Sequence, residues 1–311
     1  MESVLIKIIR VFIFIFIGFF IKKTGLTSKR GGEKLEALSF NLLLPIVVII
    51  NIWVIELNEI VNYHLMFSFF GSGILVFGLA FIIGKYLYQF EDYKCAVYGF
   101  SSCYGNLVGL GIPLAFSILG ASMAIPFMGL ALFHGIIHLS YSILIIEILR
   151  NPKLIKFDLI IKYILGLMQN SILLSMIFGL VFNYYNVPFP DLLQKIIIPV
   201  SNIALPIVLI SIGLNISGFK MSHYYKEIAT LTILKNFVHP IIAFVLAKHV
   251  FQLPSKLVFI SILASSLPSG IQTYYLSYRY SALRSIASTN IVISTVISIF
   301  TISLIVYLFD Y

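Results

Sequence analysis

Residues 41–49 read Asn-Leu-Leu-Leu-Pro-Ile-Val-Val-Ile, and residues 202–210 repeat the pattern as Asn-Ile-Ala-Leu-Pro-Ile-Val-Leu-Ile, 161 residues later. Residues 80–89 (AFIIGKYLYQ) match residues 243–252 (AFVLAKHVFQ) at an offset of 163. Matching Leu and Ile positions mean little in apolar helices, but the scarcer Asn, Pro, Lys and Gln residues also fall in register. The chain is therefore predicted to contain two similar halves, an organisation that is typical of membrane transporters.

The composition indicates a membrane protein. Hydrophobic residues make up 60% of the chain and charged residues only 11%, and the mean hydropathy is +1.03. A soluble domain carries about 25% charged residues. The apolar runs are also long enough to cross about 30 Å of hydrocarbon as helices. These numbers exclude a soluble globular protein and predict an all-α protein embedded in a lipid bilayer.

Ten apolar segments are predicted to be transmembrane helices. They cover residues 4–21, 34–56, 64–89, 94–118, 121–149, 161–184, 191–217, 226–252, 255–279 and 284–309. The repeat pairs the first five with the last five, and because five is odd, the second half enters the membrane from the opposite side. We therefore expect two inverted five-helix repeats, residues 1–149 and 161–311, with a connecting loop at residues 150–160.

The distribution of Lys and Arg predicts the orientation. Sixteen of the 21 lie toward one side of the predicted membrane region and five toward the other. Cytoplasmic loops carry the excess of positive charge, which places the 150–162 loop in the cytoplasm and both termini outside, in a multi-pass protein of the cell membrane. Since this asymmetry also accounts for the net charge of +9, no nucleic-acid partner is implied.

The fourth and ninth predicted spans contain residues that break helices. Residues 104–113 read Tyr-Gly-Asn-Leu-Val-Gly-Leu-Gly-Ile-Pro, and residues 264–273 read Ala-Ser-Ser-Leu-Pro-Ser-Gly-Ile-Gln-Thr. Gly costs a helix interior about 1 kcal/mol and Pro about 3 kcal/mol. In lipid such breaks persist only where they line a cavity, and two half-helix N-termini there would favour a carboxylate. The alternative is that glycines allow close packing and prolines kink the helices.

The spacing of Asn106, Gly111 and Pro113 resembles that of the auxin efflux carrier family, in its bacterial and archaeal form. The resemblance covers essentially the whole chain through motifs of small, Pro and polar residues: Leu44, Pro45, Ala204, Leu205, Pro206, Ile212, Gly213, Leu214, Leu267, Pro268, Tyr280, Ala287, Ser288, Thr289, Ser294 and Thr295.

The resemblance implies a fold like that of sodium/proton antiporters and bile-acid symporters. Broken helices four and nine cross at the membrane midplane, and spans one, two, six and seven form a scaffold. Family members export auxin in plants, and bacterial relatives are associated with malate, malonate and similar carboxylates. Here Leu107 and Val108 replace the small residues that often follow the Asn, and the long central cytoplasmic domain of the plant carriers is absent.

The candidate substrate-binding residues are the polar or helix-breaking residues that flank the two breaks: Asn106, Tyr104, Gly105, Pro113, Ser265, Ser266, Pro268, Ser269 and Gln272. Asn106 is the first choice because its amide donates and accepts hydrogen bonds without carrying charge. The alternatives are that Asn106 caps a broken helix and that the hydroxyl groups bond to neighbouring helices.

Two further sites carry ionisable side chains. His134 and His138 lie one helical turn apart on the fifth span, and are candidates for proton coupling or for simple packing. Lys235 on the eighth span, with His239 one turn later, is a candidate counterion for the substrate. The alternative for Lys235 is that it extends to the membrane interface. The two histidines lack a third ligand, so neither a metal nor a cofactor is predicted.

The sequence therefore predicts a secondary transporter, not an enzyme, that moves small organic anions by alternating access. The expected substrates are carboxylates such as malate, malonate or auxin-like acids. No Asp or Glu falls near the middle of a predicted span, which disfavours a sodium/proton antiporter. The alternatives are a sodium-coupled symporter of the bile-acid type and a membrane-embedded ligand sensor or enzyme. A homodimer is one of the assemblies that the chain allows.

Overall fold

The computed structural model describes residues 4–53, 62–150, 165–166, 169–219 and 221–309, and these residues form helices joined by short connections. Apart from one isolated bridge, the described residues contain no β-structure, so the all-α prediction is confirmed for them. Helices lie within all ten ranges predicted as spans. The predicted connecting loop at residues 150–160 lies outside the described residues except for Arg150.

Contacts along the chain divide it into two compact units. Unit 1 comprises residues 1–60, 108–128 and 165–218, and unit 2 comprises residues 61–107, 129–164 and 219–311. Each unit draws on both halves of the sequence. The described residues of the spans that the family resemblance assigns to a scaffold (one, two, six and seven) all fall in unit 1.

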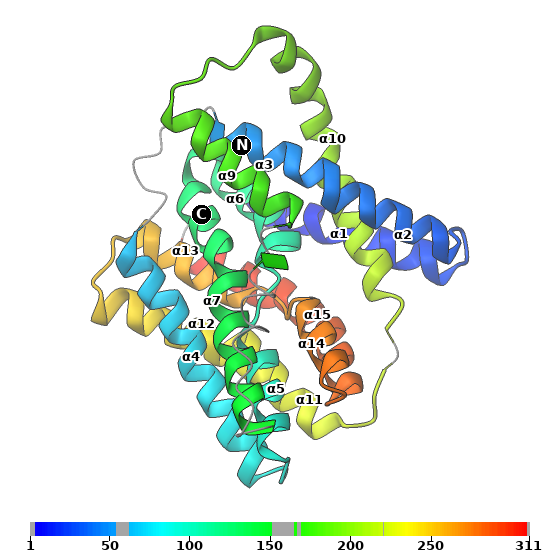
Figure 1. Cartoon of the computed structure of the whole chain (residues 1–311), viewed down its shortest axis with the longest axis vertical. Helices are drawn as coiled ribbons and strands as arrows, with labels where there is room; N and C mark the ends of the chain where they lie inside the picture. Colours follow the sequence, from blue (N-terminus) through cyan, green and yellow to red (C-terminus); the bar gives the residue numbers. More distant parts are fainter. Residues whose placement is uncertain (1–3, 54–61, 151–164, 167–168, 220, 310–311) are drawn as a thin grey trace. The chain divides into compact units, whose positions relative to one another are not determined.

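The described helical elements that lie entirely in unit 1 are α1 (Val4–Lys23), α2 (Lys29–Leu38), the π-helical turn η1 (Ser39–Leu43), α3 (Leu44–Trp53), α6 (Ile112–Met123), α9 (Ser171–Tyr184) and α10 (Asp191–Ile216). Helix α3 packs along α9, and α1 packs along α10 (Figure 1). The start of α9 is fixed by Asn170, whose side-chain oxygen accepts hydrogen bonds from the backbone amides of Ile172 and Leu173 at 2.9 and 3.2 Å.

Glycines bring the helices of unit 1 into backbone contact. A Cβ added to Gly18 of α1 would overlap the carbonyl oxygen of Ile210 on α10. A Cβ added to Gly179 of α9 would lie 3.1 Å from the carbonyl oxygen of Ile49 on α3. Gly179 lies 161 residues after Gly18, and Ile210 lies 161 residues after Ile49. The two contacts are therefore related by the offset of the sequence repeat. A two-fold relation between the halves predicts this kind of reciprocity.

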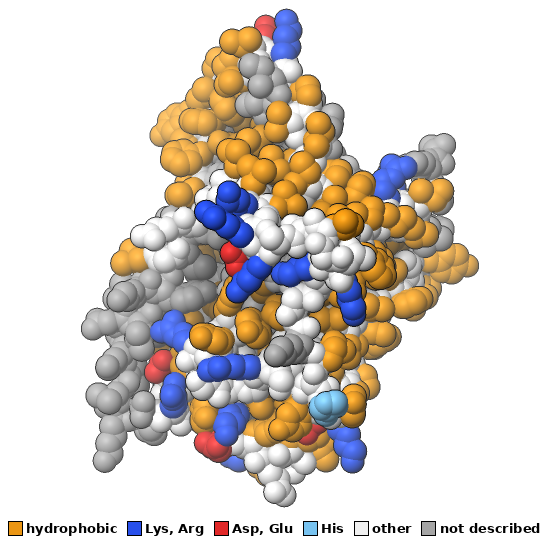
Figure 2. Space-filling model, turned by 90° about the vertical axis from the view of Figure 1, so that its right-hand side faces the viewer, with side chains coloured by type: hydrophobic (Ala, Val, Ile, Leu, Met, Phe, Trp, Pro, Cys, Tyr) orange, Lys and Arg blue, Asp and Glu red, His pale blue; other side chains and the backbone are white. Residues whose placement is uncertain are grey.

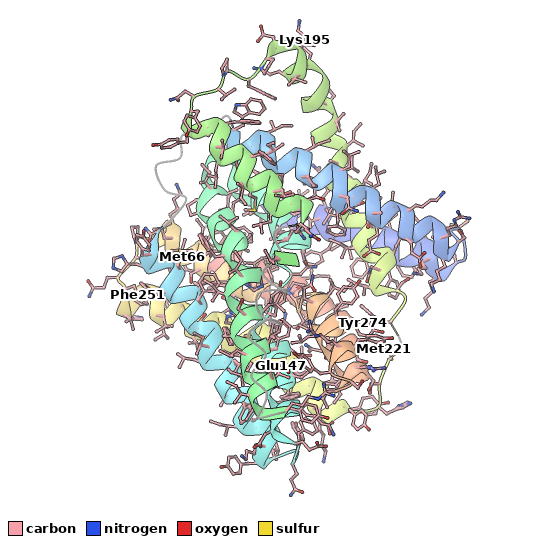
Figure 3. The ribbon with its side chains drawn as sticks, viewed as in Figure 1. Met66, Glu147, Lys195, Met221, Phe251 and Tyr274 are labelled. Carbon is pink, nitrogen blue, oxygen red and sulfur yellow. The ribbon has the colours of Figure 1, made fainter. Side chains whose placement is uncertain are left out.

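Unit 2 contains most of the remaining elements: α4 (Tyr63–Tyr86), α5 (Asp92–Cys103), α7 (Ile125–Arg150), α11 (Tyr225–Ile233), η3 (Leu234–Val238), α12 (His239–Val245), η4 (Leu246–Val250), α13 (Ser255–Ser266), α14 (Gln272–Arg279) and α15 (Arg284–Leu308). Side chains of α4, α5, α7 and α14 share one apolar core, which includes Phe77, Phe100 and Ile143. Figure 3 labels Glu147 near the end of α7. Its carboxylate accepts a hydrogen bond of 2.7 Å from the hydroxyl of Tyr280.

The matching segments 80–89 and 243–252 end in the same way. Gln89 and Gln252 both adopt the left-handed conformation, with φ of 53° and 49°. In each case the amide of the next residue donates a hydrogen bond to the carbonyl six residues earlier. Phe90 donates to Gly84 at 3.0 Å, and Leu253 donates to Ala247 at 2.9 Å. The left-handed residue resembles that of a Schellman cap, but the closing bond spans one residue more, and this unusual ending occurs at repeat-related positions.

Five helices among the described residues are long and apolar enough to cross a membrane: Lys29–Trp53, Tyr63–Tyr86, Ile125–Arg150, Tyr225–Val250 and Arg284–Leu308. Four shorter apolar helices accompany them. Figure 2 shows extended areas of hydrophobic side chains on the face in view, with Lys and Arg in smaller groups. Such a surface fits a lipid environment.

Candidate functional site

Two helix breaks meet inside unit 2. Helix α5 ends at Cys103 and α13 ends at Ser266, and the extended residues that follow run antiparallel to each other. The amide of Asn106 donates a hydrogen bond of 2.8 Å to the carbonyl of Pro268, and the amide of Gly270 donates one of 3.0 Å to that of Tyr104. The breaks predicted in residues 104–113 and 264–273 therefore lie side by side, and they form what we call the crossing (residues 104–106 and 267–270).

The ammonium group of Lys235 lies at the end of α13. Its Nζ donates a hydrogen bond of 2.6 Å to the carbonyl of Ser265 and lies 3.4 Å from Nδ1 of His239. The side chain has 0% exposure, so the alternative that Lys235 extends to the membrane interface is wrong. A cation is favoured here because the C-terminal end of a helix carries partial negative charge.

The position of Lys235 depends on a π-helical turn. Lys235 and its neighbour Asn236 both lie in η3 and are both buried. The side-chain amide of Asn236 donates a hydrogen bond of 3.1 Å to the carbonyl of Ser294 on α15, while Lys235 reaches α13. Single π-helical turns of this kind occur frequently at functional sites.

His134 contacts the crossing directly. Its Nε2 lies 3.0 Å from the carbonyl oxygen of Gly105, and its ring stacks on that of Tyr104 with the centroids 4.2 Å apart. The ring of His138 lies 4.6 Å from that of His134. Both histidines are buried. Since Lys235 also lies beside the crossing, the structure brings together the two predicted ionisable sites, on α7 and on η3.

A hydrogen-bonded network fastens the crossing to α15 and α11. The hydroxyl of Ser269 donates to the carbonyl of Ser101 at 3.1 Å and accepts from the amide of Asn290 at 2.7 Å. Asn290 in turn accepts a hydrogen bond of 3.0 Å from the hydroxyl of Thr232. Neither Asn290 nor Thr232 was predicted from the sequence. The isolated amide of Asn290 within an apolar span was the available signal, because a buried amide needs partners.

The remaining predicted residues lie in three different settings. The hydroxyl groups of Ser265 and Ser266 bond to carbonyls of their own helix, of Ile262 and Leu263, both at 2.9 Å. Gln272 is the half-buried first residue of α14. Pro113 is buried in α6, in unit 1, seven residues after Asn106 in the chain. The crossing itself is formed from Tyr104, Gly105, Asn106, Pro268 and Ser269 among the predicted residues.

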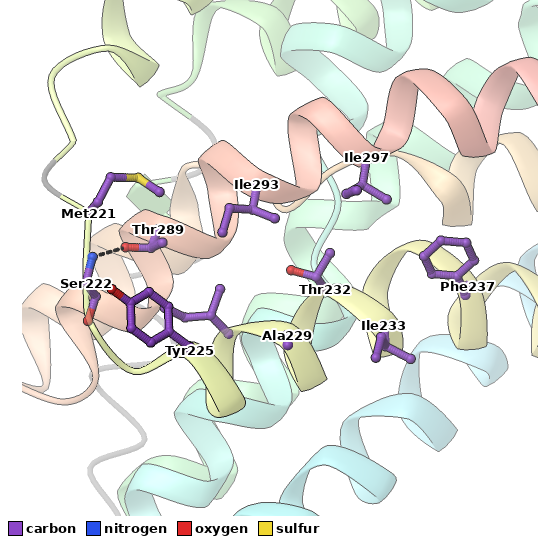
Figure 4. Close-up of a pocket in the computed structure, with 11 residues that line it drawn as sticks. Met221, Ser222, Tyr225, Ala229, Thr232, Ile233, Phe237, Thr289, Ile293 and Ile297 are labelled. Carbon is purple, nitrogen blue, oxygen red and sulfur yellow. Dashed lines mark hydrogen bonds between the residues drawn. The ribbon is translucent and has the colours of Figure 1, made fainter.

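A cavity of about 310 Å³ lies elsewhere in unit 2, between α15 and the α11–η3 segment (Figure 4). Its lining is mostly apolar, with Ile233, Phe237 and Ile297 in its walls. The amide of Ser222 donates a hydrogen bond of 2.8 Å to the hydroxyl of Thr289 beside it. The sequence did not predict this cavity, whose walls come from two segments more than 40 residues apart in the chain.

We expect Ser269→Ala to destabilise the protein by about 1–3 kcal/mol, because the buried amide of Asn290 and the carbonyl of Ser101 each lose a partner. Ser266→Ala is the matched control, since its buried hydroxyl bonds only within α13. Thermal unfolding of the two purified variants measures the difference. Equal unfolding temperatures would contradict the role of Ser269 in fastening the crossing.

Comparison with known proteins identifies the family of the chain. A protein of Rhizobium meliloti (strain 1021) that is named "Putative malonate transporter" is 22% identical over 251 residues, which cover 81% of this chain and 78% of that protein. A family model described as "Membrane transport protein" matches residues 3–306. The resemblance inferred from the motifs is thereby confirmed. Because the match covers nearly the whole chain, the protein is a multi-pass membrane protein that belongs to the auxin efflux carrier-like family of membrane transport proteins.

Proposed function

We propose that the protein is a secondary transporter that moves small carboxylates through the membrane by alternating access. The main support is the buried ammonium of Lys235 at the crossing. The buried polar and charged side chains of the described residues include no Asp or Glu, so none of these residues offers Lys235 a buried carboxylate. A buried charge without a counterion costs several kcal/mol. An anion that enters from outside would remove that cost.

The comparison supports the substrate class. The relative from Rhizobium meliloti is named for malonate, a small dicarboxylate, and it aligns with most of the chain. In our proposal one carboxylate of such a substrate lies near Lys235, and Asn106 supplies a neutral amide next to it. Since an amide interacts with many oxygen-bearing groups, malate and auxin-like acids belong to the same class of candidates.

The proposed transport cycle moves unit 2, which holds the crossing, against unit 1. The proposed architecture has ten transmembrane helices in two inverted repeats, and the reciprocal glycine contacts and the paired Gln89 and Gln252 caps support it. The proposed orientation has a cytoplasmic 150–162 loop and two extracytoplasmic termini. Cysteines introduced near either terminus should therefore react with an impermeant thiol reagent added outside intact cells.

The alternatives differ in what they require. A sodium-coupled symporter would need a cation site, and at the crossing the ammonium of Lys235 already contacts the carbonyl at the end of α13. Sodium-dependent uptake would nevertheless favour that alternative. Binding without flux in sealed vesicles would favour a sensor, and chemical change of the substrate would favour an enzyme.

The first test is uptake of labelled malonate, malate and indole-3-acetate into proteoliposomes. We expect saturable uptake by the wild type and a loss of about ten-fold or more in Asn106→Ala, because a hydrogen bond to a charged group contributes about 1.5–3 kcal/mol. Asn186→Gly is the control, since Asn186 lies in an exposed turn with a φ of 50° that Gly adopts readily. Unchanged uptake by Asn106→Ala would remove this residue from the site.

A further inference from the structure

The six histidines of the chain fall into two groups. His64, His223 and His249 are exposed, whereas His134, His138 and His239 are buried around the ring of Phe69. The Phe69 ring centroid lies 5.7, 5.7 and 6.0 Å from those of the three buried histidines. The three buried histidines, with Lys235, therefore form one basic cluster inside unit 2.

Several nitrogen atoms of this cluster have no hydrogen-bond partner within the described part of the chain. They are Nδ1 of His134, both ring nitrogens of His138 and Nε2 of His239. An unpaired buried polar group is destabilising, and native proteins rarely retain one without a reason. A Leu or Phe would pack here without that cost. Packing alone therefore does not explain these histidines.

The absence of a side chain at Gly73 leaves room for the imidazole of His138. Gly73 of α4 faces the ring, and a Cβ added at Gly73 would overlap Nε2 of His138. The ring of Phe70 contacts the same imidazole, with the centroids 5.2 Å apart. His138 of α7 thus packs against α4, and the ring nitrogen that carries no proton in the neutral imidazole is available to accept one.

The titratable neighbours of His138 come from three directions. Tyr141 of α7 lies 5.7 Å away between ring centroids, and its hydroxyl lies 3.3 Å from Sγ of Cys103 on α5. Tyr104 of the crossing lies 6.3 Å away between ring centroids. Lys235 and His239 belong to the η3–α12 side of the cluster. Among the described residues, no buried carboxylate accompanies them.

The charges of the His134–His138 pair and the number of possible ligands around it favour binding of a proton over a metal ion. Two imidazolium rings whose centroids are 4.6 Å apart repel each other, so the His134–His138 pair has room for one positive charge. In the described part of the chain, no three His, Cys, Asp or Glu side chains lie close enough to hold a metal ion. The pair therefore suits a single proton.

We propose that the His134–His138 pair is the proton-binding site of the transporter, and that it takes up one proton from water when the carboxylate substrate binds at the crossing. The inference rests on the proposed function. His134 contacts the carbonyl of Gly105, the residue before Asn106, so the anion arrives next to the pair. A negative charge there favours the protonated imidazole, and by linkage the proton strengthens substrate binding by the same factor. Substrate and proton then cross together.

The decisive measurement is proton uptake on binding. Malonate is added to the purified protein in weak buffer with a pH indicator, at a pH where malonate is fully ionised, while calorimetry measures its binding. We expect the wild type and the exposed-histidine control His64→Gln to take up about one proton per bound malonate. Because the proton strengthens binding, we expect His138→Gln to bind malonate more weakly than the wild type and without this uptake.

Transport provides the second readout. Exchange of labelled for unlabelled malonate at equal pH on both sides needs no net proton movement, whereas net uptake would follow an imposed pH gradient. We expect His138→Gln to retain exchange and to lose the acceleration by the gradient. The variant His134→Gln is a second check if His138→Gln does not fold.

The outcomes separate the two proposals. A wild type that binds and exchanges malonate, but takes up no proton and ignores the gradient, would overturn the proton site and leave the carboxylate transporter standing. Proton uptake by His138→Gln at the wild-type level would likewise overturn the proton site alone. Absence of binding and exchange of all three tested carboxylates in the wild type would overturn the proposed function, and the proton site with it.

Discussion

Lys235→Met is expected to weaken carboxylate binding at least about thirty-fold while leaving the protein as stable as the wild type or more so. The ammonium of Lys235 is fully buried and contacts a backbone carbonyl and an imidazole. Its removal leaves the Ser265 carbonyl without this partner, which costs about 1–3 kcal/mol. The same substitution removes a desolvated charge, and replacing buried charges by apolar residues is often neutral or stabilising by about 1–4 kcal/mol.

Malonate binding, unlike stability, should be weakened by Lys235→Met. In our proposal Lys235 is the counterion of the substrate, and loss of one member of a buried charge pair costs about 2–5 kcal/mol. The Kd for malonate should therefore rise at least about thirty-fold. Calorimetry measures the Kd, thermal unfolding measures the stability, and uptake into proteoliposomes measures transport.

Lys226→Met is the matched control, because Lys226 is an exposed lysine nine residues earlier, on α11. It should leave binding and uptake at the wild-type level. The expected combination in Lys235→Met, of retained stability and weakened binding, separates a functional lysine from a structural one. Lower stability with unchanged malonate affinity would assign Lys235 to the fold and remove it from the substrate site.

The sequence predicted the helix breaks because their cause is local. Gly105 and Pro268 are poor helix residues in any surroundings, and lipid leaves their backbone groups few partners, so the break and its consequence follow from composition alone. The apolar runs predicted the positions of the helices for the same reason. The pairing of Asn106 with Pro268 across the crossing was only suggested, by the matching places of the two breaks in the repeat.

The environment of each polar side chain could not be predicted, because it depends on helix rotation. Lys235 is buried through the π-helical turn η3, and one extra residue in a turn leaves no mark in the sequence. Ser265 and Ser266 were predicted as substrate ligands, but their hydroxyls bond within α13. Asn290 reaches the crossing from a helix that carried no predicted site residue.

Gly18→Ala and Gly213→Ala are expected to destabilise unit 1 severely. The added Cβ of Gly18 would overlap the carbonyl oxygen of Ile210 on α10, and that of Gly213 would overlap the carbonyl oxygen of Ile15 on α1. Because both obstacles are backbone atoms, no side chain can rotate away, and α1 and α10 must separate. Overpacking of well-packed sites costs about 1–3 kcal/mol, and we expect the upper end of this range or more for each variant.

Gly32→Ala is the control within unit 1, because nothing lies within 4 Å of the added Cβ and Ala suits a helix better than Gly. Thermal unfolding and size-exclusion profiles in detergent measure the effect. Gly179→Ala tests the repeat as well, since its Cβ would lie 2.9 Å from the Ile52 Cβ and 3.1 Å from the Ile49 carbonyl oxygen. The 2.9 Å contact is too short for two Cβ atoms, but it is much longer than the 1.9 Å at Gly18, so Gly179→Ala should destabilise less than Gly18→Ala and more than Gly32→Ala. An equal response of all four variants would show that backbone contact does not hold these helices together.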